Sequence, residues 1–243
     1  MNELTDMKTM EGIIFHAKNV LDQALSPNWA GIPKGIIKDC KGIIILTVAE
    51  AGFIFSGTVG TGVIIAHKED GTWSPPSALG LGGIGWGLMA GAEVKDLVIC
   101  VMDDATLKTF SGEHHVKIGT QIAATVGPLG READASFNFS EKGGMGVTFA
   151  YAFSKGVFGG ISIETAVLNA RSKENERFYG KPAKPSEILF ENAVDAPKGK
   201  GVDELHHRLH LLRDGKIMIP AHAAQMEAPQ AAFVAKSGEV MAA

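Results

Sequence analysis

The sequence predicts an α+β fold: a single antiparallel, β-rich domain, barrel- or sandwich-like, with an N-terminal amphipathic helix and short peripheral and C-terminal helices. Two observations support this class. Many apolar stretches rich in β-branched residues are joined by short turns that contain glycine or proline, which is typical of antiparallel sheets. The chain has 243 residues, 45% of them apolar, which is enough for one large domain with a substantial core.

An amphipathic helix is predicted from residue 3 to residue 25, where apolar residues recur at spacings of three and four until Ser26-Pro27 ends the pattern. Such a helix either docks on the protein's own core or lies in a membrane interface. Interfacial helices usually carry Lys and Arg on their polar face, whereas Lys8 and Lys18 are outnumbered here by acidic residues. The charge pattern therefore favours docking. The apolar stripe consists of Met7, Met10, Ile13, Ile14, Ala17, Val20, Leu21, Ala24 and Leu25.

A short second helix is predicted to begin at Ile32-Pro33, because proline suits the first turn of a helix. Its lysines, Lys34, Lys38 and Lys41, recur at spacings of four and three and therefore share one face. The opposite face carries Ile36, Ile37 and Cys40. The lysine face is either a solvated surface or a minimal site for an anionic headgroup.

From residue 42 onwards the pattern is that of strands, predicted at residues 43–48, 53–66, 96–102, 117–126, 133–139, 147–153 and 158–169. Asp70-Gly71 predicts a hairpin turn. Short helices are predicted at residues 103–110, capped by Asp103 or Asp104, and at 172–178, 186–190 and 203–213. We expect residues 1–195 to form the main domain, 196–215 a linker with the C-terminal helix, and 216–243 a mobile Ala-rich tail.

The glycine-rich stretch from Trp73 to Glu93 has two interpretations. The segment Gly80–Gly85 matches the spacing G-x-G-x-x-G of a nucleotide-binding loop, which would make the chain an enzyme. However, Pro75-Pro76 stands where that motif needs a buried strand, and further glycines stand where it needs a helix. Alternation favours a strand instead. It predicts that Ile84, Trp86 and Leu88 face an apolar core and that Gly83, Gly85 and Gly87 lie against another chain segment.

Composition excludes several classes of protein. The formal net charge of −4 argues against a general nucleic-acid binder. Cys40 and Cys100 are too few for a disulfide framework and stand in apolar surroundings, which predicts reduced, buried thiols. Neither a secretory signal nor an uncharged apolar segment of about 18 residues is apparent. We therefore expect a soluble, cytoplasmic protein, and the sequence indicates no cofactor.

Two further constellations could carry chemistry. Glu93 and Glu164 could act as an acid–base pair or bind a cation, but such acids more often pair with a base, here Arg131 or Lys155, or face solvent. His206 and His210 have the i, i+4 spacing of a metal pair, although a solvated helix face explains them more simply. Arg131 follows a Gly-Pro-Leu-Gly turn whose backbone N–H groups could hold an anion.

From about Met7 to Glu191 the sequence resembles the SYLF domain family. The motifs that carry the resemblance are Ile32-Pro33, Ala51-Gly52-Phe53, Gly60-Thr61-Gly62, the run from Asp70 to Ala78, Gly91-Ala92-Glu93, the run from Val126 to Arg131, Ser154-Lys155-Gly156, the run from Phe158 to Glu164, and Phe178-Tyr179-Gly180. The resemblance implies a non-catalytic domain that binds phosphoinositides at membranes. It also implies a role in actin assembly at endocytic sites or membrane ruffles.

In the SYLF family, lipid binding is attributed largely to the N-terminal helix and nearby basic residues. The first candidates for lipid binding are Lys34, Lys38 and Lys41, the one basic face that neighbouring acids do not cancel, followed by Lys8 and Lys18 and then by Arg131 and Lys155. The expected partners are an anionic phospholipid membrane and actin or actin regulators, with the protein peripherally associated with membranes. Two alternatives remain: a nucleotide-binding enzyme that uses Gly80–Gly85, and an actin-assembly scaffold that does not contact lipid.

Overall fold

The computed structural model describes residues 6–25, 32, 34–112, 116–127, 135–141 and 144–216. Every strand pairing is antiparallel, which confirms the α+β class with an antiparallel sheet. The elements follow in the order α1 (Met10–Ala24), α2 (Lys34–Asp39), β1 (Gly42–Ala66), β2 (Ser77–Val101), α3 (Asp104–Phe110), β3 (Val116–Gly127), β4 (Ala135–Glu141), β5 (Gly144–Ala170), α4 (Ser172–Tyr179), α5 (Pro185–Phe190) and α6 (Val202–Arg213).

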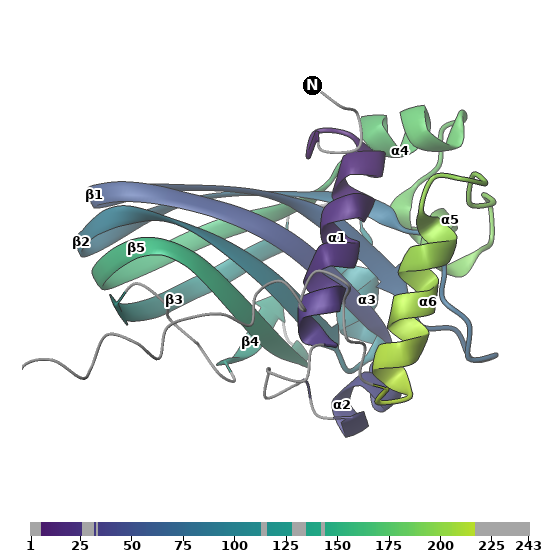
Figure 1. Ribbon diagram of the computed structural model, residues 1–243, viewed down its shortest axis with the longest axis horizontal. Coiled ribbons are helices and arrows are strands. Elements are labelled where there is room, and N and C mark those ends of the chain that lie inside the picture. The colour runs from purple at the N-terminus through teal and green to yellow at the C-terminus, as the bar shows by residue number, and fades with distance from the viewer. Residues whose placement is uncertain are drawn as a thin grey trace, which may run out of the picture.

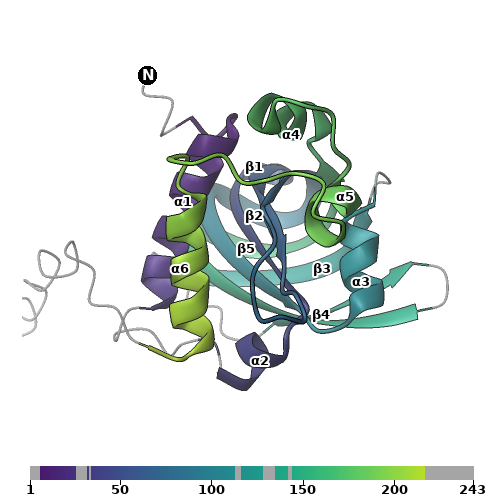
Figure 2. The same ribbon diagram turned by 90° about the vertical axis from the view of Figure 1, so that its right-hand side faces the viewer.

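The sheet has the order β1-β2-β5-β3, and β4 pairs with the part of β5 that precedes its pairing with β3. Among the described residues β1 and β3 do not pair with each other, so the sheet is not closed. Figure 1 shows the strands extending away from the helices, with α1 and α6 lying side by side across one end of the sheet. Figure 2 looks onto that helical end.

The long strands bend back on themselves. The N–H of His67, just after β1, donates to the carbonyl of Lys41, just before it, at 2.8 Å. The bend lies between Phe53 and Phe55, where the register with β2 shifts and Ile54 has φ of 67°. β2 pairs with β1 on one side and with β5 on the other, so all three strands turn back at the far end in Figure 1.

The bend corrects the predicted number of strands. Residues 43–48 and 53–66 form one strand, β1, rather than two. The glycine-rich stretch and residues 96–102 both belong to β2, and residues 147–153 and 158–169 both belong to β5. The sequence signal was ambiguous because small residues between two apolar runs can mark either a turn or a bend within a strand.

Local turn and cap predictions are confirmed. Gly71 has φ of 81°, and the Asp70 carboxylate accepts hydrogen bonds from both the N–H and the hydroxyl of Thr72, at 2.9 and 2.6 Å. These bonds fix the hairpin between β1 and β2. Asp103 caps α3 by accepting a hydrogen bond from the N–H of Thr106 at 2.8 Å.

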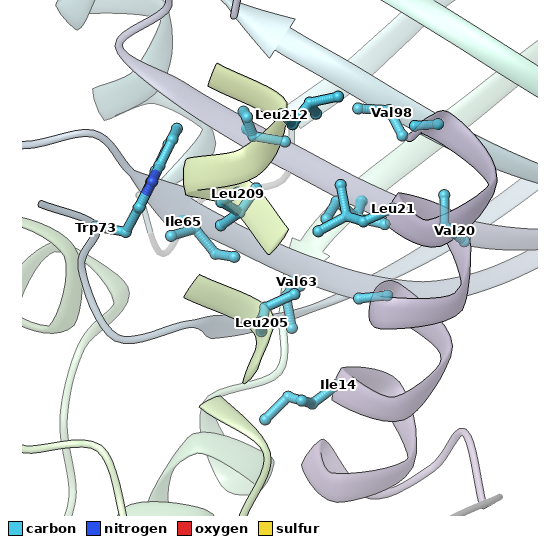
Figure 3. Close-up of a cluster of buried hydrophobic side chains, with 14 of the residues drawn as sticks. Ile14, Val20, Leu21, Val63, Ile65, Trp73, Val98, Leu205, Leu209 and Leu212 are labelled. Carbon is cyan, nitrogen blue, oxygen red and sulfur yellow. The ribbon is translucent and has the colours of Figure 1, made fainter. Parts of the chain in front are cut away.

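At the helical end the sheet is covered on both faces. On one face, here called the α1 face, sheet residues such as Val63, Ile65 and Val98 pack with side chains of α1 and α6 (Figure 3). On the other, the α3 face, Ile44, Leu46, Ile64 and Leu79 pack with residues of α3 and α5. Successive residues of a strand point to opposite faces, so β1 and β2 each contribute to both clusters.

One prediction about the glycine-rich stretch, most of which lies in β2, is wrong. Ile84 and Trp86 do not lie in the core: their side chains are 75% and 60% exposed. Leu88 has a side chain outside the described residues. Gly85 is buried and pairs with Ser56 on one side and Glu164 on the other. Alternation gave the correct face of the strand, but α1 and α6 cover that face only at one end of the sheet.

Candidate functional site

The basic face of α2 is an exposed surface. Ile37 and Cys40 are fully buried and hold the helix on the core, while Lys38 and Lys41 are exposed. Neither of these lysine side chains has an ion pair with another described residue. Lys34 belongs to the same helix, although its side chain lies outside the described residues. Lys34 and Lys38 therefore lie on α2, whereas Lys41 follows this helix, just before β1; the three are called the α2 lysines below.

The other predicted lipid-binding residues lie elsewhere. Lys18 forms an ion pair with Glu204 of α6, and its side chain is only 15% exposed. Lys8 is exposed before the start of α1, at the end of that helix remote from α2 in Figure 1. Lys155 pairs through its backbone with Val94, but its side chain lies outside the described residues, as does Arg131.

Helix α1 is docked as the charge pattern predicted. Its apolar residues are buried against the α1 face and α6, as Ile14, Val20 and Leu21 show in Figure 3. Its acidic residues bind basic partners on later elements: Asp22 pairs with Arg208 at 2.7 Å. Among the described residues, no helix is long and apolar enough to cross a membrane.

Glu11 is the most connected of these acids. It binds Arg177 of α4 and Lys200, the latter at 2.9 Å, and Arg177 also binds Glu174 at 2.7 Å. Burial alone would raise the pKa of Glu11, but the hydrogen bonds from Arg177 and Lys200 outweigh it and lower the pKa to about 2. The charged carboxylate therefore stabilises the docked helix.

The lowered pKa predicts an acid-dependent stability. A carboxylate whose pKa is lowered by folding stabilises the protein above its unfolded value of 4.5, and the gain is lost as the pH falls towards 2. We expect the parent to lose more unfolding free energy than Glu11→Gln between pH 6 and pH 3 in urea titrations. Two profiles that run parallel would show that Glu11 is not coupled to folding.

The glycine-rich stretch cannot act as a phosphate loop. Gly80, Gly82 and Gly85 lie within β2, and each pairs with β1 on one side and β5 on the other. Their backbone groups therefore belong to a sheet rather than to a loop that opens a helix. The nucleotide-binding interpretation was wrong.

Glu93 is buried within an ionic cluster that the sequence did not predict. Its carboxylate lies 2.7 Å from the ammonium group of Lys95, which is 3.7 Å from the carboxylate of Glu50. A basic partner was expected for this acid, and Lys95 is one; the side chains of Arg131 and Lys155 lie outside the described residues. Residues two apart in a strand share a face, and Glu50 is directly opposite Glu93 in the register. The contact between Glu93 and Lys95 follows from their shared strand, and the contact with Glu50 follows from the register of β1 and β2.

The histidine pair does not form a metal site in the described part of the chain. There, no group of three or more His, Cys, Asp or Glu side chains is suited to hold a metal. The Nε2 atom of His206 lies 2.9 Å from the Ser74 carbonyl, and burial lowers the pKa of this imidazole. His206 therefore joins α6 to the loop before β2, which corrects the expectation of a solvated face.

Fold and surface together define a class: an α+β domain with a bent antiparallel sheet, helices docked on one end, and an exposed basic helix. A family model described as "Ysc84: Las17-binding protein actin regulator" matches residues 82–211, just over half of the chain. The chain belongs to this family, the Ysc84 or SYLF family. The resemblance noted in the sequence is thereby confirmed.

Curated relatives agree with this assignment. Protein YSC84 of Saccharomyces cerevisiae is 41% identical over 166 residues, which cover 68% of this chain and 35% of the relative. Human SH3 domain-containing YSC84-like protein 1 is 34% identical over 178 residues, which cover 73% of this chain and 50% of the relative. The chain thus spans between about a third and a half of these relatives. Among solved structures, VapD of Rhodococcus equi matches with a TM-score of only 0.31 at 13% identity, covering 53% of this chain and 99% of that one.

Proposed function

We propose that this domain is a non-catalytic, peripheral membrane module that binds phosphoinositide headgroups and acts together with regulators of actin assembly. The observation that carries the lipid part is that Lys38 on α2 and Lys41 just after it are exposed and have no acidic partner among the described residues. The family description supports the actin part. Binding at the cytoplasmic face of endocytic membranes fits both.

The lysines of α2 are favoured over the N-terminal helix for a physical reason. A lysine near an anionic surface contributes about 1 kcal/mol to binding, provided that its charge is free to face the lipid. Lys18 is held by Glu204, and the apolar face of α1 is buried in the core. Membrane insertion of α1 would require this core to open, whereas Lys38 and Lys41 can contact headgroups in the folded state.

Replacing Lys34, Lys38 and Lys41 by Glu should weaken binding to phosphoinositide vesicles at least ~100-fold. Three attractions of about 1 kcal/mol are lost and repulsion is added, and 1.4 kcal/mol corresponds to tenfold. The melting temperature should stay within a few degrees, because exposed substitutions change stability little. Vesicle flotation at several salt concentrations measures the effect, and parental binding should weaken as salt rises.

A control with the same change in net charge comes from exposed lysines on other elements, Lys108, Lys173 and Lys198. Their replacement by Glu should reduce flotation much less, since they are not clustered on α2. Flotation of the α2 variant at the parental level would place the headgroup site elsewhere. Equal losses in both variants would show that net charge alone governs binding.

A scaffold that acts on actin assembly without lipid is the second candidate, favoured by the family description. The two functions separate when the full chain is tested on each target alone. Flotation with phosphoinositide vesicles supports the membrane module. Cosedimentation with actin filaments, combined with no flotation on any vesicle, would replace it by the scaffold.

A further inference from the structure

The end of the sheet remote from the helices carries a cluster of exposed apolar side chains. We call this cluster the apolar tip; it consists of Phe53, Ile54, Phe55, Val59, Ile84 and Trp86. Phe53 and Phe55 are 73% and 70% exposed. The cluster is continuous across two strands, because Phe55 pairs with Trp86. Soluble monomeric proteins rarely expose contiguous apolar patches of this kind without a function.

The tip extends the α1 face beyond the helices that cover it. In β1, the odd-numbered residues lie on this face: Val63 and Ile65 are buried under α1 and α6, whereas Phe55 and Val59 are exposed. Each bent arm of β1 contains about 12 residues, roughly 40 Å at ~3.3 Å per residue. Two helices lying across the strands cover only about 20 Å of that length, at roughly 10 Å each.

The opposite face of the same segment is polar and buried. Ser56 and Thr58 alternate with the exposed residues of β1, and both are less than 9% exposed. Their hydroxyl groups have no hydrogen-bond partner among the described residues. Glu50 and Glu93 are also buried at this end of the sheet. Apolar side chains outside and polar ones inside reverse the order of a water-soluble sheet and match strands that face lipid.

The distribution of charge along β1 and β2 also matches a bilayer. Neither Ala51–Ala66 in β1 nor Ser77–Ala92 in β2 contains a charged Asp, Glu, Lys or Arg. In both strands the first charges next to the bend are Glu50 and Glu93, which are directly opposite each other in the register. From that level to Ile54 the chain can reach about 13 Å, compared with the ~5–10 Å depth of interfacial elements.

We propose that the apolar tip inserts into the interfacial layer of the bilayer, with Phe53, Phe55 and Trp86 as its aromatic anchors. This inference rests on the proposed membrane function and adds a second contact to the α2 lysines, on a different part of the molecule (Figure 1). A bilayer is proposed rather than a protein partner because β1 and β2, the strands that carry the tip, have no Asp, Glu, Lys or Arg between the bend and the level of Glu50 and Glu93. Phenylalanine and tryptophan are suited to the boundary between headgroups and acyl chains.

Tryptophan fluorescence of the full chain tests the insertion. With phosphatidylcholine vesicles that contain phosphoinositide, emission should shift to shorter wavelength, and brominated acyl chains should quench it. The variant Trp86→Phe, which retains Trp29 and the buried Trp73, should lose the quenching that is due to Trp86. Its binding should stay within a few-fold of the parent's, because phenylalanine keeps an aromatic side chain at this position. Flotation of the parent without quenching of Trp86 would overturn the insertion while leaving the proposed function standing.

A binding measurement completes the test. Replacing Phe53 and Phe55 by Asn should weaken vesicle binding at least tenfold, or about 1.4 kcal/mol, at an unchanged melting temperature. The matched control is Phe190→Asn on α5, which alters an exposed aromatic residue outside the tip and should bind like the parent. Equal binding by all three proteins would overturn the inference. A parent that binds no vesicle would overturn the proposed function and the inference together.

Two alternatives to the bilayer, a further part of the same chain and a second copy of it, are tested in the absence of lipid. Acrylamide should quench Trp86 as readily as an exposed tryptophan, and sedimentation should show no self-association that the Asn variants abolish. Shielding of Trp86 in the monomer would mean that residues 217–243 already cover the tip. A dimer lost in the Asn variants would assign the tip to a second copy. Either result would overturn insertion.

Discussion

Leu21→Ala is expected to lower the free energy of unfolding by about 3 kcal/mol. Leu21 of α1 is fully buried against the α1 face of the sheet and α6. Shortening a leucine to alanine in such a core typically costs about 2–5 kcal/mol of unfolding free energy. At temperatures where the variant remains folded, vesicle binding should be unchanged, because Leu21 never faces the lipid. Urea unfolding and vesicle flotation measure the two effects.

The matched control on the same helix is Asn19→Ala, which alters an exposed residue and should change stability by less than about 0.5 kcal/mol. The pair of variants separates a docked helix from a membrane anchor. A variant at Leu21 as stable as the parent, but weaker in flotation, would mean that α1 leaves the core and binds the membrane itself.

Gly62→Val is expected to destabilise the domain by more than about 3 kcal/mol, enough to unfold much of the population. A Cβ atom at this position would lie 2.0 Å from the carbonyl oxygen of Ile45 and 2.8 Å from the Cα atom of Leu46. Backbone atoms cannot move aside as the end of a side chain can, so the two arms of β1 must separate. Thermal unfolding measures the loss.

Gly57→Val provides the comparison on the same arm of β1, because a Cβ atom there would have nothing within 4 Å. Valine favours the strand conformation, so this variant should be neutral or slightly stabilising. Equal destabilisation by the two substitutions would mean that both positions need glycine for its backbone conformation, not for the space that its missing side chain leaves. It would contradict the close approach of the arms at Gly62.

Local features of the fold were readable from the sequence because they depend on near neighbours in the chain. The Asp70-Gly71 turn and the Asp103 cap need only a side chain and the backbone two or three residues away. Periodicity likewise gave α1 and its buried stripe from Met10 onwards, whereas residues 7–9, predicted as helix, precede it and Thr9 is its N-cap. The acidic residues of α1 correctly favoured docking, although their partners on α4 and α6 could not be foreseen.

Long-range features were not readable in the same way. Alternation placed Ile84 and Trp86 on the same face as the core, but it carries no information about how far the covering helices reach. The partners of Glu93 were missed because Glu50 meets it only through the register of β1 and β2. The ion pair that holds Lys18 was missed for the same reason, because Glu204 is far from it in the sequence.

Hydrogen exchange of the vesicle-bound full chain distinguishes a docked α1 from a membrane-bound one, because it reports on α1, α2 and the apolar tip at once. We expect exchange to slow in residues 34–41, 53–59 and 84–86, while residues 10–24 exchange as in the lipid-free protein. Altered exchange in residues 10–24, together with no change at the tip and α2, would contradict this expectation and assign membrane binding to an undocked α1.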